Sequence, residues 1–236
     1  MPTKIDWCDE TINPLGHGCY GPDGTAEKPN VCPYCYAKTI AQRGMRGCEK
    51  CKAFIPHTHF EQLARLQTWK KPKTVFVQSM GDLFHDAIPD EWISEVFKAC
   101  EAAPQHRYLF LTKNHKCYKK GPVYYQNQVK PKDNWWFGAS HTKGDMWSVL
   151  MSMSYVANSF VSIEPLRGYV HFPIHAKMPK WVIVGAESGS RKDKIIPKKE
   201  WIQNIADMCG MSGVPVFMKE SLRGLMGDEF IQQKPF

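Results

Sequence analysis

The amino-acid sequence predicts an α/β protein built as a full or partial (β/α) barrel of about six to seven parallel strands. Beyond residue 70, short apolar runs recur at spacings of roughly 20 to 30 residues, and several are followed by a segment of helical periodicity. These runs are continuous, which is typical of strands buried on both faces of a parallel sheet. A chain of 236 residues can bury a sizeable core, so we expect one domain over residues 1–236.

The elements follow in order along the chain. Pro89 and Asp90 suit a helix start, and Gly210 suits a helix end. Residues 1–70 are irregular and rich in cysteine, glycine and proline, with a short helical stretch near 37–45. The expected strands are 74–79, 107–112, 135–140, 159–165, 181–188 and 214–220, and the expected longer helices are 89–100, 145–156 and 197–210.

Polar residues stand where the expected strands end. In such barrels the chemistry collects at the carboxyl ends of the strands, although any single polar residue there can equally be a helix cap or a loop residue. The repetition of the pattern over successive strands indicates a site better than any one member does. The residues concerned are Ser79, Asp82, Thr112, Lys113, Ser140, Glu164, Glu187, Lys219 and Glu220.

Composition narrows the class of protein. No run of 18 apolar residues occurs, and the start "MPTKIDWCDE" lacks the apolar core of a secretory leader, so we expect a cytoplasmic protein without membrane association. The 31 basic and 23 acidic residues give a net charge of +8, which fits either an ordinary basic surface or binding to nucleic acid. Nine cysteines in a reducing compartment indicate metal binding or catalysis more than disulfides.

Three cysteines near the start form a distinct group. Cys32 and Cys35 are spaced as C-x2-C, and Cys19 can join them if the polar residues 20–31 loop out. Three thiolates can hold three corners of an iron–sulfur cluster or part of a zinc site, but a structural zinc ion normally takes four protein ligands. A catalytic metal takes three protein ligands and keeps one position open, and the C-x2-C pair by itself is a weak signal for either kind of site.

The string Asn13-Pro14…Gly18-Cys19…Cys32-Pro33-Tyr34-Cys35-Tyr36-Ala37 resembles the cluster loop of radical S-adenosylmethionine enzymes, in particular the spore-photoproduct-lyase-like branch. The gap between Cys19 and Cys32 is longer than in that branch. It is similar to the gap in an uncharacterised, phage-associated three-cysteine-motif protein family. The segments "VFVQSMGDLFHDAIPD", "FVSIEPL" and "WVIVGAESG" resemble that family as well. The resemblance covers most of the chain, in order.

The resemblance implies a 4Fe–4S cluster ligated by Cys19, Cys32 and Cys35, with S-adenosylmethionine chelating the fourth iron. Reductive cleavage would give methionine and a 5′-deoxyadenosyl radical that abstracts hydrogen from an unknown substrate, for which nucleic acid or a nucleotide is one candidate. An external donor of flavodoxin or ferredoxin type would supply the electron. By position, the expected cofactor-binding residues are Tyr34, Asp82, Lys113, Ser140, Glu164 and Glu187.

A second thiol pair follows in "GCEKCKAFIPHTHFE". Cys48 and Cys51 can bind zinc or part of an auxiliary cluster, or they can be two reduced thiols beside surface histidines. His57 and His59 are less strongly indicated, because their H-x-H spacing is tighter than that of a zinc-finger pair. A zinc-bearing, nucleic-acid-binding module on an α/β scaffold is therefore the alternative to the radical enzyme. A simple electron carrier fits less well, since it normally uses four cysteines.

Overall fold

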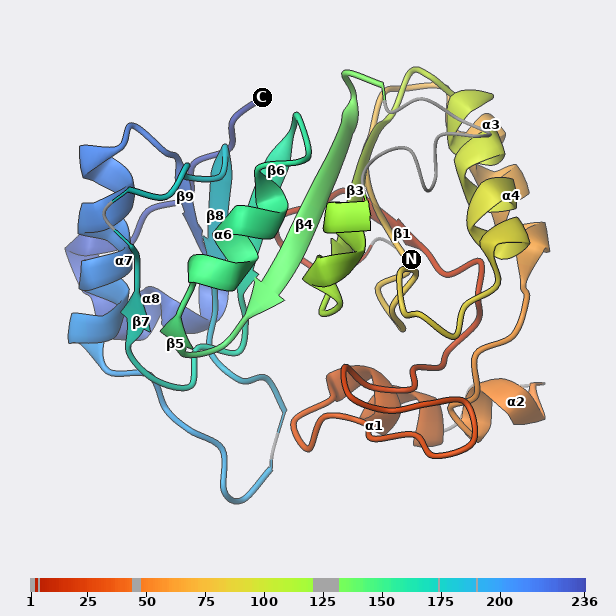
Figure 1. Ribbon diagram of the computed structural model, residues 1–236, viewed down its shortest axis with the longest axis horizontal. Helices are drawn as coiled ribbons and strands as arrows, with labels where there is room; N and C mark the ends of the chain where they lie inside the picture. The colour runs from red at the N-terminus through yellow and green to blue at the C-terminus, as the bar shows by residue number, and fades with distance from the viewer. Residues whose placement is uncertain (1–2, 4, 44–47, 121–131, 174, 190) are drawn as a thin grey trace. The chain divides into compact units, whose positions relative to one another are not determined.

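The structure, a computed structural model, describes residues 3, 5–43, 48–120, 132–173, 175–189 and 191–236 (Figure 1). These residues form two compact units, Met1–Trp136 and Phe137–Phe236. Seven strands form one parallel sheet in the order β1-β2-β3-β4-β6-β8-β9. The predicted fold class is confirmed: the protein is α/β, and its strand order ends at β1 and at β9, as in a partial barrel.

The first unit contains three parallel strands and the helices that follow them. Within the sheet, Thr11 pairs with Phe76 and Val75 pairs with Tyr108. The strands are β1 (Glu10–Ile12), β2 (Thr74–Val77) and β3 (Arg107–Thr112), and the helices are α1 (Tyr36–Gln42), α2 (Glu49–Lys52), η1 (Phe60–Ala64), α3 (Arg65–Thr68), α4 (Asp90–Glu101) and η2 (His115–Lys120).

Aromatic side chains fill the core of the first unit. Helix α4 turns an apolar face inward, and its Phe97 ring lies 5.3 Å from the Phe110 ring of β3 and 5.1 Å from the Trp135 ring. On the β1 side, the Trp7 ring lies 4.7 Å from the Phe76 ring of β2. Fully burying one such side chain contributes about 1.5 to 3 kcal/mol to the free energy of folding, so this cluster stabilises the strands of the first unit.

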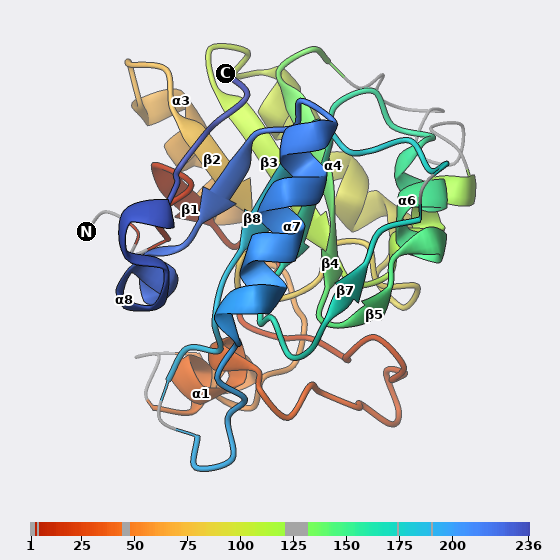
Figure 2. The same ribbon diagram turned by 90° about the vertical axis from the view of Figure 1, so that its left-hand side faces the viewer.

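The second unit continues the sheet. In its strands, Gly138 leaves room for the Phe160 ring, because an added Cβ would lie 2.3 Å from that ring. Figure 2 shows α7 beside β8 and β9, and its Ile202 and Ile205 are fully buried. The elements are β4 (Trp135–His141), which begins in the first unit, β5 (Gly144–Asp145), α6 (Trp147–Met153), β6 (Ser159–Ile163), β7 (Val170–His171), β8 (Trp181–Val184), α7 (Lys199–Met211), β9 (Val216–Met218), η3 (Glu220–Leu222), α8 (Arg223–Met226) and η4 (Gly227–Glu229).

The six strands and three longer helices expected from the sequence are present, with ends that differ by a few residues. The sequence did not predict β1, β5 or β7, which have only two or three residues each. The short helix expected near 37–45 is α1, and residues 44–45 lie outside the described residues. Among the described helices, none combines the length and the apolar character needed to cross a bilayer.

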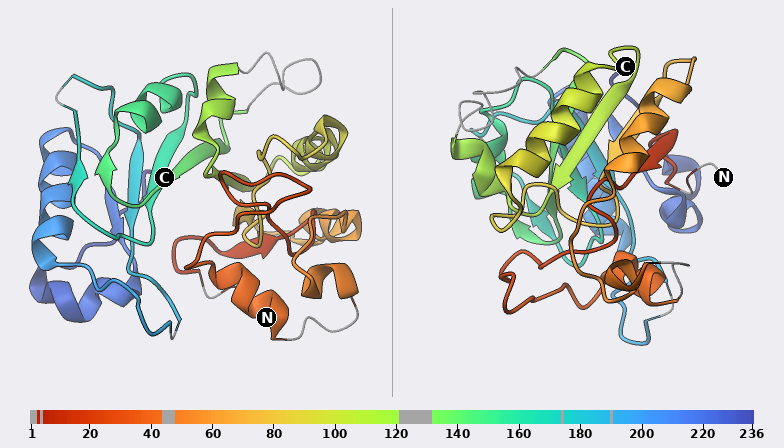
Figure 3. Two further views of the ribbon diagram at one scale, coloured as in Figure 1. Left: turned by 60° about the horizontal axis from the view of Figure 1, so that its bottom comes forward. Right: turned by 90° about the vertical axis from the view of Figure 1, so that its right-hand side faces the viewer.

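The cysteine-rich segment forms one end of the first unit. Figure 3 shows α1 and α2, in red-orange and orange, close together there. The irregular, cysteine-rich N-terminal segment expected from the sequence is therefore present.

Candidate metal centres

Two of the three predicted cluster cysteines sit in a tight turn. The backbone N–H of Cys35 donates to the carbonyl of Cys32 at 3.0 Å, and Cys35 then caps α1, its Sγ accepting from the N–H of Lys38 at 3.4 Å. The third thiol, Cys19, accepts from the N–H of Gly21 at 3.3 Å. Backbone N–H groups thus already point at two of the sulfurs, as they do at metal-bound thiolates.

The three thiols interact electrostatically. Cys35 lies within range of both Cys19 and Cys32. Burial, followed by the negative charge of Asp82, raises the pKa of Cys19 to about 12, and burial also raises the pKa of Cys35. Without a cation, burial keeps Cys19 and Cys35 in the thiol form, whereas a metal ion would bind them as thiolates. Thiolates are the usual ligands of iron–sulfur clusters, but among the described residues only the Cys48 group described below brings three or more metal-ligating atoms within reach of one metal ion.

The loop that leads to Cys19 is fastened to the turn after β2. The Asn13 side chain accepts from the backbone N–H of Met80 at 2.9 Å. Gln78, which is buried and has a φ of 63°, accepts from the N–H of Leu15 at 3.0 Å and donates to the carbonyl of Gly16 at 2.9 Å. Sequence analysis did not identify Gln78, because nothing in its local pattern marks a side chain that fastens a loop 62 residues earlier.

Asp82 joins two strand ends. One carboxylate oxygen accepts from the Thr112 hydroxyl at 2.7 Å and from the N–H of Phe84 at 3.1 Å, and the other accepts from the N–H of Lys113 at 2.9 Å. A carboxylate offers about four acceptor positions, so three are in use and one remains. Both Asp82 and Lys113 lie within electrostatic range of Cys19.

Tyr34, predicted to lie against the cofactor, is half-buried in the turn between Cys32 and Cys35. A cavity of about 310 Å³ borders Cys19. It lies between the 20–31 loop, residues 53–56 and Lys38 of α1. The first unit therefore places Cys19, Cys35 and Lys113 within electrostatic range of one another. Cys32 lies within range of Cys35, Asp82 lies within range of Cys19, and Tyr34 shares the turn of Cys32 and Cys35.

The other three predicted cofactor residues belong to the second unit. Ser140 lies near the end of β4, and Glu164 directly follows β6, where it forms an ion pair with Lys219. The buried Glu187 accepts from Arg191 at 2.6 and 2.9 Å, and this hydrogen bonding lowers the pKa of its carboxyl. Glu164 and Glu187 thus have cationic partners of their own.

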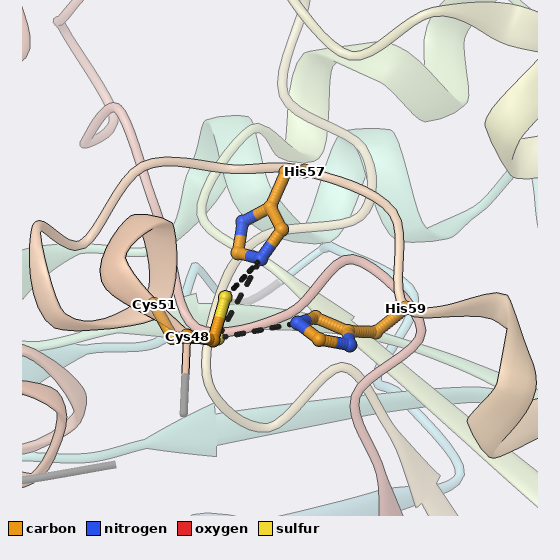
Figure 4. A group of neighbouring side chains, drawn as sticks. All are labelled: Cys48, Cys51, His57 and His59. Carbon is orange, nitrogen blue, oxygen red and sulfur yellow. Dashed lines mark hydrogen bonds between the residues drawn. The ribbon is translucent and has the colours of Figure 1, made fainter. Parts of the chain in front are cut away.

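The second thiol pair forms a compact group with both histidines (Figure 4). One ligand atom from each of Cys48, Cys51, His57 and His59 lies within 4.8 Å of all the others. The His57 Nε2 is 3.1 Å from the Cys48 Sγ and 3.6 Å from the Cys51 Sγ, and the His59 Nε2 is 3.6 Å from the Cys51 Sγ. This Cys2His2 group can hold a metal ion such as zinc.

Sequence analysis indicated the two cysteines of this group more strongly than the two histidines. No regular helix carries the histidines, since they lie in irregular chain between α2 and η1. Their approach depends on how residues 53–59 fold back over α2, which sequence spacing does not show. The backbone N–H of Cys51 and then the His59 ring lower the pKa of Cys48 to about 6. Ionised Cys48 is a ready metal ligand at neutral pH.

Comparison with known families gives one match. The family model described as "Protein of unknown function (DUF5131)" matches residues 2–226. No match to the chain was found among curated proteins or among solved structures. The match covers almost the whole chain, and the description of the family assigns no activity.

Proposed function

The chain belongs to this DUF5131 family, and we propose that it is a radical S-adenosylmethionine enzyme with a 4Fe–4S cluster held by Cys19, Cys32 and Cys35. The observation that carries the proposal is that Cys19 and Cys35 lie within electrostatic range of each other and of Lys113, at the carboxyl ends of β2 and β3, where Asp82 fixes the backbone of Lys113. When bound, a reduced cluster supplies one electron to S-adenosylmethionine, which yields methionine and a 5′-deoxyadenosyl radical able to take hydrogen from a substrate. Three protein ligands leave the fourth iron free for the cofactor.

The polypeptide's part is to hold the thiols and to bind the charged ends of S-adenosylmethionine. Lys113, which forms no carboxylate ion pair within the described residues, is the counterion for the cofactor's carboxylate. Asp82 fixes the backbone of Lys113 and keeps one acceptor position for the cofactor's ammonium group. Ser140 and Glu164 are proposed to hold the ribose hydroxyls, and Tyr34 to lie against the adenine. Glu187 is proposed to line either the cofactor or the substrate. A flavodoxin- or ferredoxin-type donor would provide the electron.

The test is anaerobic reconstitution with iron and sulfide, followed by dithionite and S-adenosylmethionine, with 5′-deoxyadenosine measured by chromatography. We expect 5′-deoxyadenosine from the native chain and from Cys209→Ala, a control that removes a buried thiol of α7. Cys32→Ala should lose both the cluster and the product. Cleavage retained by Cys32→Ala would refute the assignment.

A second candidate function is a zinc-bearing module that binds nucleic acid. The Cys2His2 group and the net charge of +8 favour it. Iron content distinguishes the two functions. Bound zinc is compatible with both of them, whereas a bound 4Fe–4S cluster is compatible only with the radical enzyme. Protein purified without oxygen should be brown, with about four irons and four sulfides per chain, if the radical enzyme is correct. Colourless protein that contains zinc alone would favour the binding module.

A further inference from the structure

The histidines of the Cys2His2 group are oriented as metal ligands. The His57 Nδ1 is 2.7 Å from the carbonyl of Ile55, and the His59 Nδ1 is 2.5 Å from a carboxylate oxygen of Glu61. Both partners are acceptors, so each Nδ1 carries the proton and each Nε2 presents its lone pair to the sulfurs (Figure 4). Metal-bound histidines almost always show this arrangement, in which a carbonyl or carboxylate fixes the ring.

The distances fit a single ion. Tetrahedral zinc with bonds of about 2.3 Å to sulfur and about 2.0 to 2.1 Å to nitrogen requires sulfur–nitrogen separations of about 3.6 Å. Three of the four sulfur–nitrogen separations are 3.1, 3.6 and 3.6 Å, and all four ligand atoms lie within 4.8 Å of one another. A two-iron cluster with two cysteines and two histidines places the sulfurs and the nitrogens on different irons, which would hold them farther apart. The geometry therefore favours one mononuclear ion over an auxiliary cluster.

The group is also packed against the segment that leads to Cys19. The N–H of His59 donates to the carbonyl of Pro14 at 2.6 Å, and the N–H of His17 lies 3.4 Å from the Cys51 Sγ. Gly16 has a φ of 61°, and a Cβ added to it would lie 2.6 Å from the His57 ring. Residues 14–18 thus touch three of the four candidate ligands, either through the backbone or by close packing.

We propose that Cys48, Cys51, His57 and His59 bind one Zn²⁺, and that this ion fixes the segment 14–18 and with it the position of Cys19. Both cysteines bind as thiolates, and a cysteine that is still protonated releases its proton to solvent on binding, so that two negative charges balance the two charges of the ion. The zinc is structural, because all four positions are filled by the protein. Cys19 follows the fastened segment directly, and the ion therefore acts on the three-thiol loop through the backbone.

The zinc assignment does not depend on the radical enzyme proposed above. The iron bound by Cys19, Cys32 and Cys35 and the zinc bound by the Cys2His2 group are measured separately. Either assignment can therefore be refuted while the other stands. The first experiment measures zinc and iron by mass spectrometry in protein expressed with both metals and purified without chelators. We expect one zinc per chain in the native protein and in a variant in which Cys19, Cys32 and Cys35 are all alanine.

Two further variants complete this experiment. Cys51→Ala together with His59→Ala should lose the zinc, whereas His175→Gln, at an exposed histidine outside the group, should keep it. Exchange with Co²⁺ should give the absorption bands of a tetrahedral site with thiolate ligands. Native protein without zinc, or iron at this group in the variant that lacks Cys19, Cys32 and Cys35, would overturn the assignment.

The second experiment tests the fixing of residues 14–18. Native protein, with and without removal of zinc by a chelator, is compared by amide hydrogen exchange. We expect the amides of Gly16, His17 and Gly18 to exchange at least tenfold faster after zinc removal, while the amides of α7 serve as the unaffected reference. Unchanged exchange in residues 14–18 after complete removal of zinc would show that the ion does not hold this segment.

Discussion

The carboxylate of Asp82 shows how one residue serves both the fold and the candidate site. It accepts from Thr112 and from the backbone of Lys113, so it fixes the end of β3 relative to the turn after β2. The side chain of Lys113 then lies within electrostatic range of Cys19 and Cys35. Lys113 is consequently the residue at which cofactor binding can be tested without disturbing the thiols.

We expect Lys113→Ala to raise the dissociation constant of S-adenosylmethionine by about 10- to 100-fold, because one charge-assisted hydrogen bond contributes about 1.5 to 3 kcal/mol. Iron content should be unchanged. Lys116→Ala, an exposed lysine three residues along the chain, is the control. Equilibrium binding to reconstituted protein is the measurement, and an unaltered constant for Lys113→Ala would remove this lysine from the site.

Glu61 supports the zinc site through the His59 ring. Replacing it by alanine removes the acceptor of the His59 Nδ1 proton, and such partners typically change metal affinity by about 10- to 100-fold. We therefore expect Glu61→Ala to bind zinc at least tenfold more weakly in a competition titration with a zinc-binding dye. Glu49→Ala, an exposed acid in the first turn of α2, should behave as the native protein. Equal affinities for both variants would contradict this role.

Glu187 adds a dependence of stability on pH. Its pKa lies below the ordinary 4.5 because Arg191 donates two hydrogen bonds to it. A carboxyl whose pKa is lowered by folding stabilises the protein above its unfolded pKa, and it loses that contribution as the pH falls through the folded value. Between pH 7 and pH 3, the native protein should lose roughly 1 kcal/mol more unfolding free energy than Glu187→Gln, as measured by urea titration. Equal losses would show that the pair contributes nothing.

At the scale of elements, most of the sheet could be predicted, because a continuous apolar run such as 181–184 allows few other structures. The three-residue strand β1 could not, since its pairing with β2 depends on residues more than 60 positions away. The same limit applies to the sites. Local spacing indicated Cys32 with Cys35, and Cys48 with Cys51, whereas His57, His59 and Gln78 reach their partners only through the tertiary fold.

Close backbone contact between residues 18 and 55–56 gives a prediction at this scale. A Cβ on Gly18 would lie 2.3 Å from the carbonyl carbon of Ile55 and from the nitrogen of Pro56. Both are backbone atoms, so relieving the clash would require a shift of the main chain. We expect Gly18→Ala to lower the free energy of unfolding by about 1 to 3 kcal/mol.

Gly210 of α7 provides the matched control, because nothing lies within 4 Å of an added Cβ there. Gly210→Ala should raise stability by up to about 1 kcal/mol, since alanine is the better helix former. Denaturant titrations of the two variants measure both effects. A Gly18→Ala protein as stable as the native one would mean that residues 14–18 are not held against residues 55–59.

At the scale of the whole molecule, the chain combines a parallel α/β sheet with two thiol-bearing groups in its first unit. Fold class could be predicted because it depends on repeated, local patterns. The reaction depends on whether one iron stays without a protein ligand, which neither composition nor the net charge of +8 decides. The metal that the chain binds therefore distinguishes the radical enzyme from the nucleic-acid-binding module, whereas the fold is compatible with both.

Electron paramagnetic resonance of the dithionite-reduced protein, recorded before and after addition of S-adenosylmethionine, tests the open iron most directly. If Cys19, Cys32 and Cys35 leave one iron free, the signal of the reduced cluster should change when the amino and carboxylate groups of the cofactor bind there. Adenosine at the same concentration, which lacks the amino and carboxylate groups, is the matched control and should leave the spectrum as it was. A reduced cluster whose spectrum is identical with and without S-adenosylmethionine, or a protein that takes up no iron at all, would contradict the account.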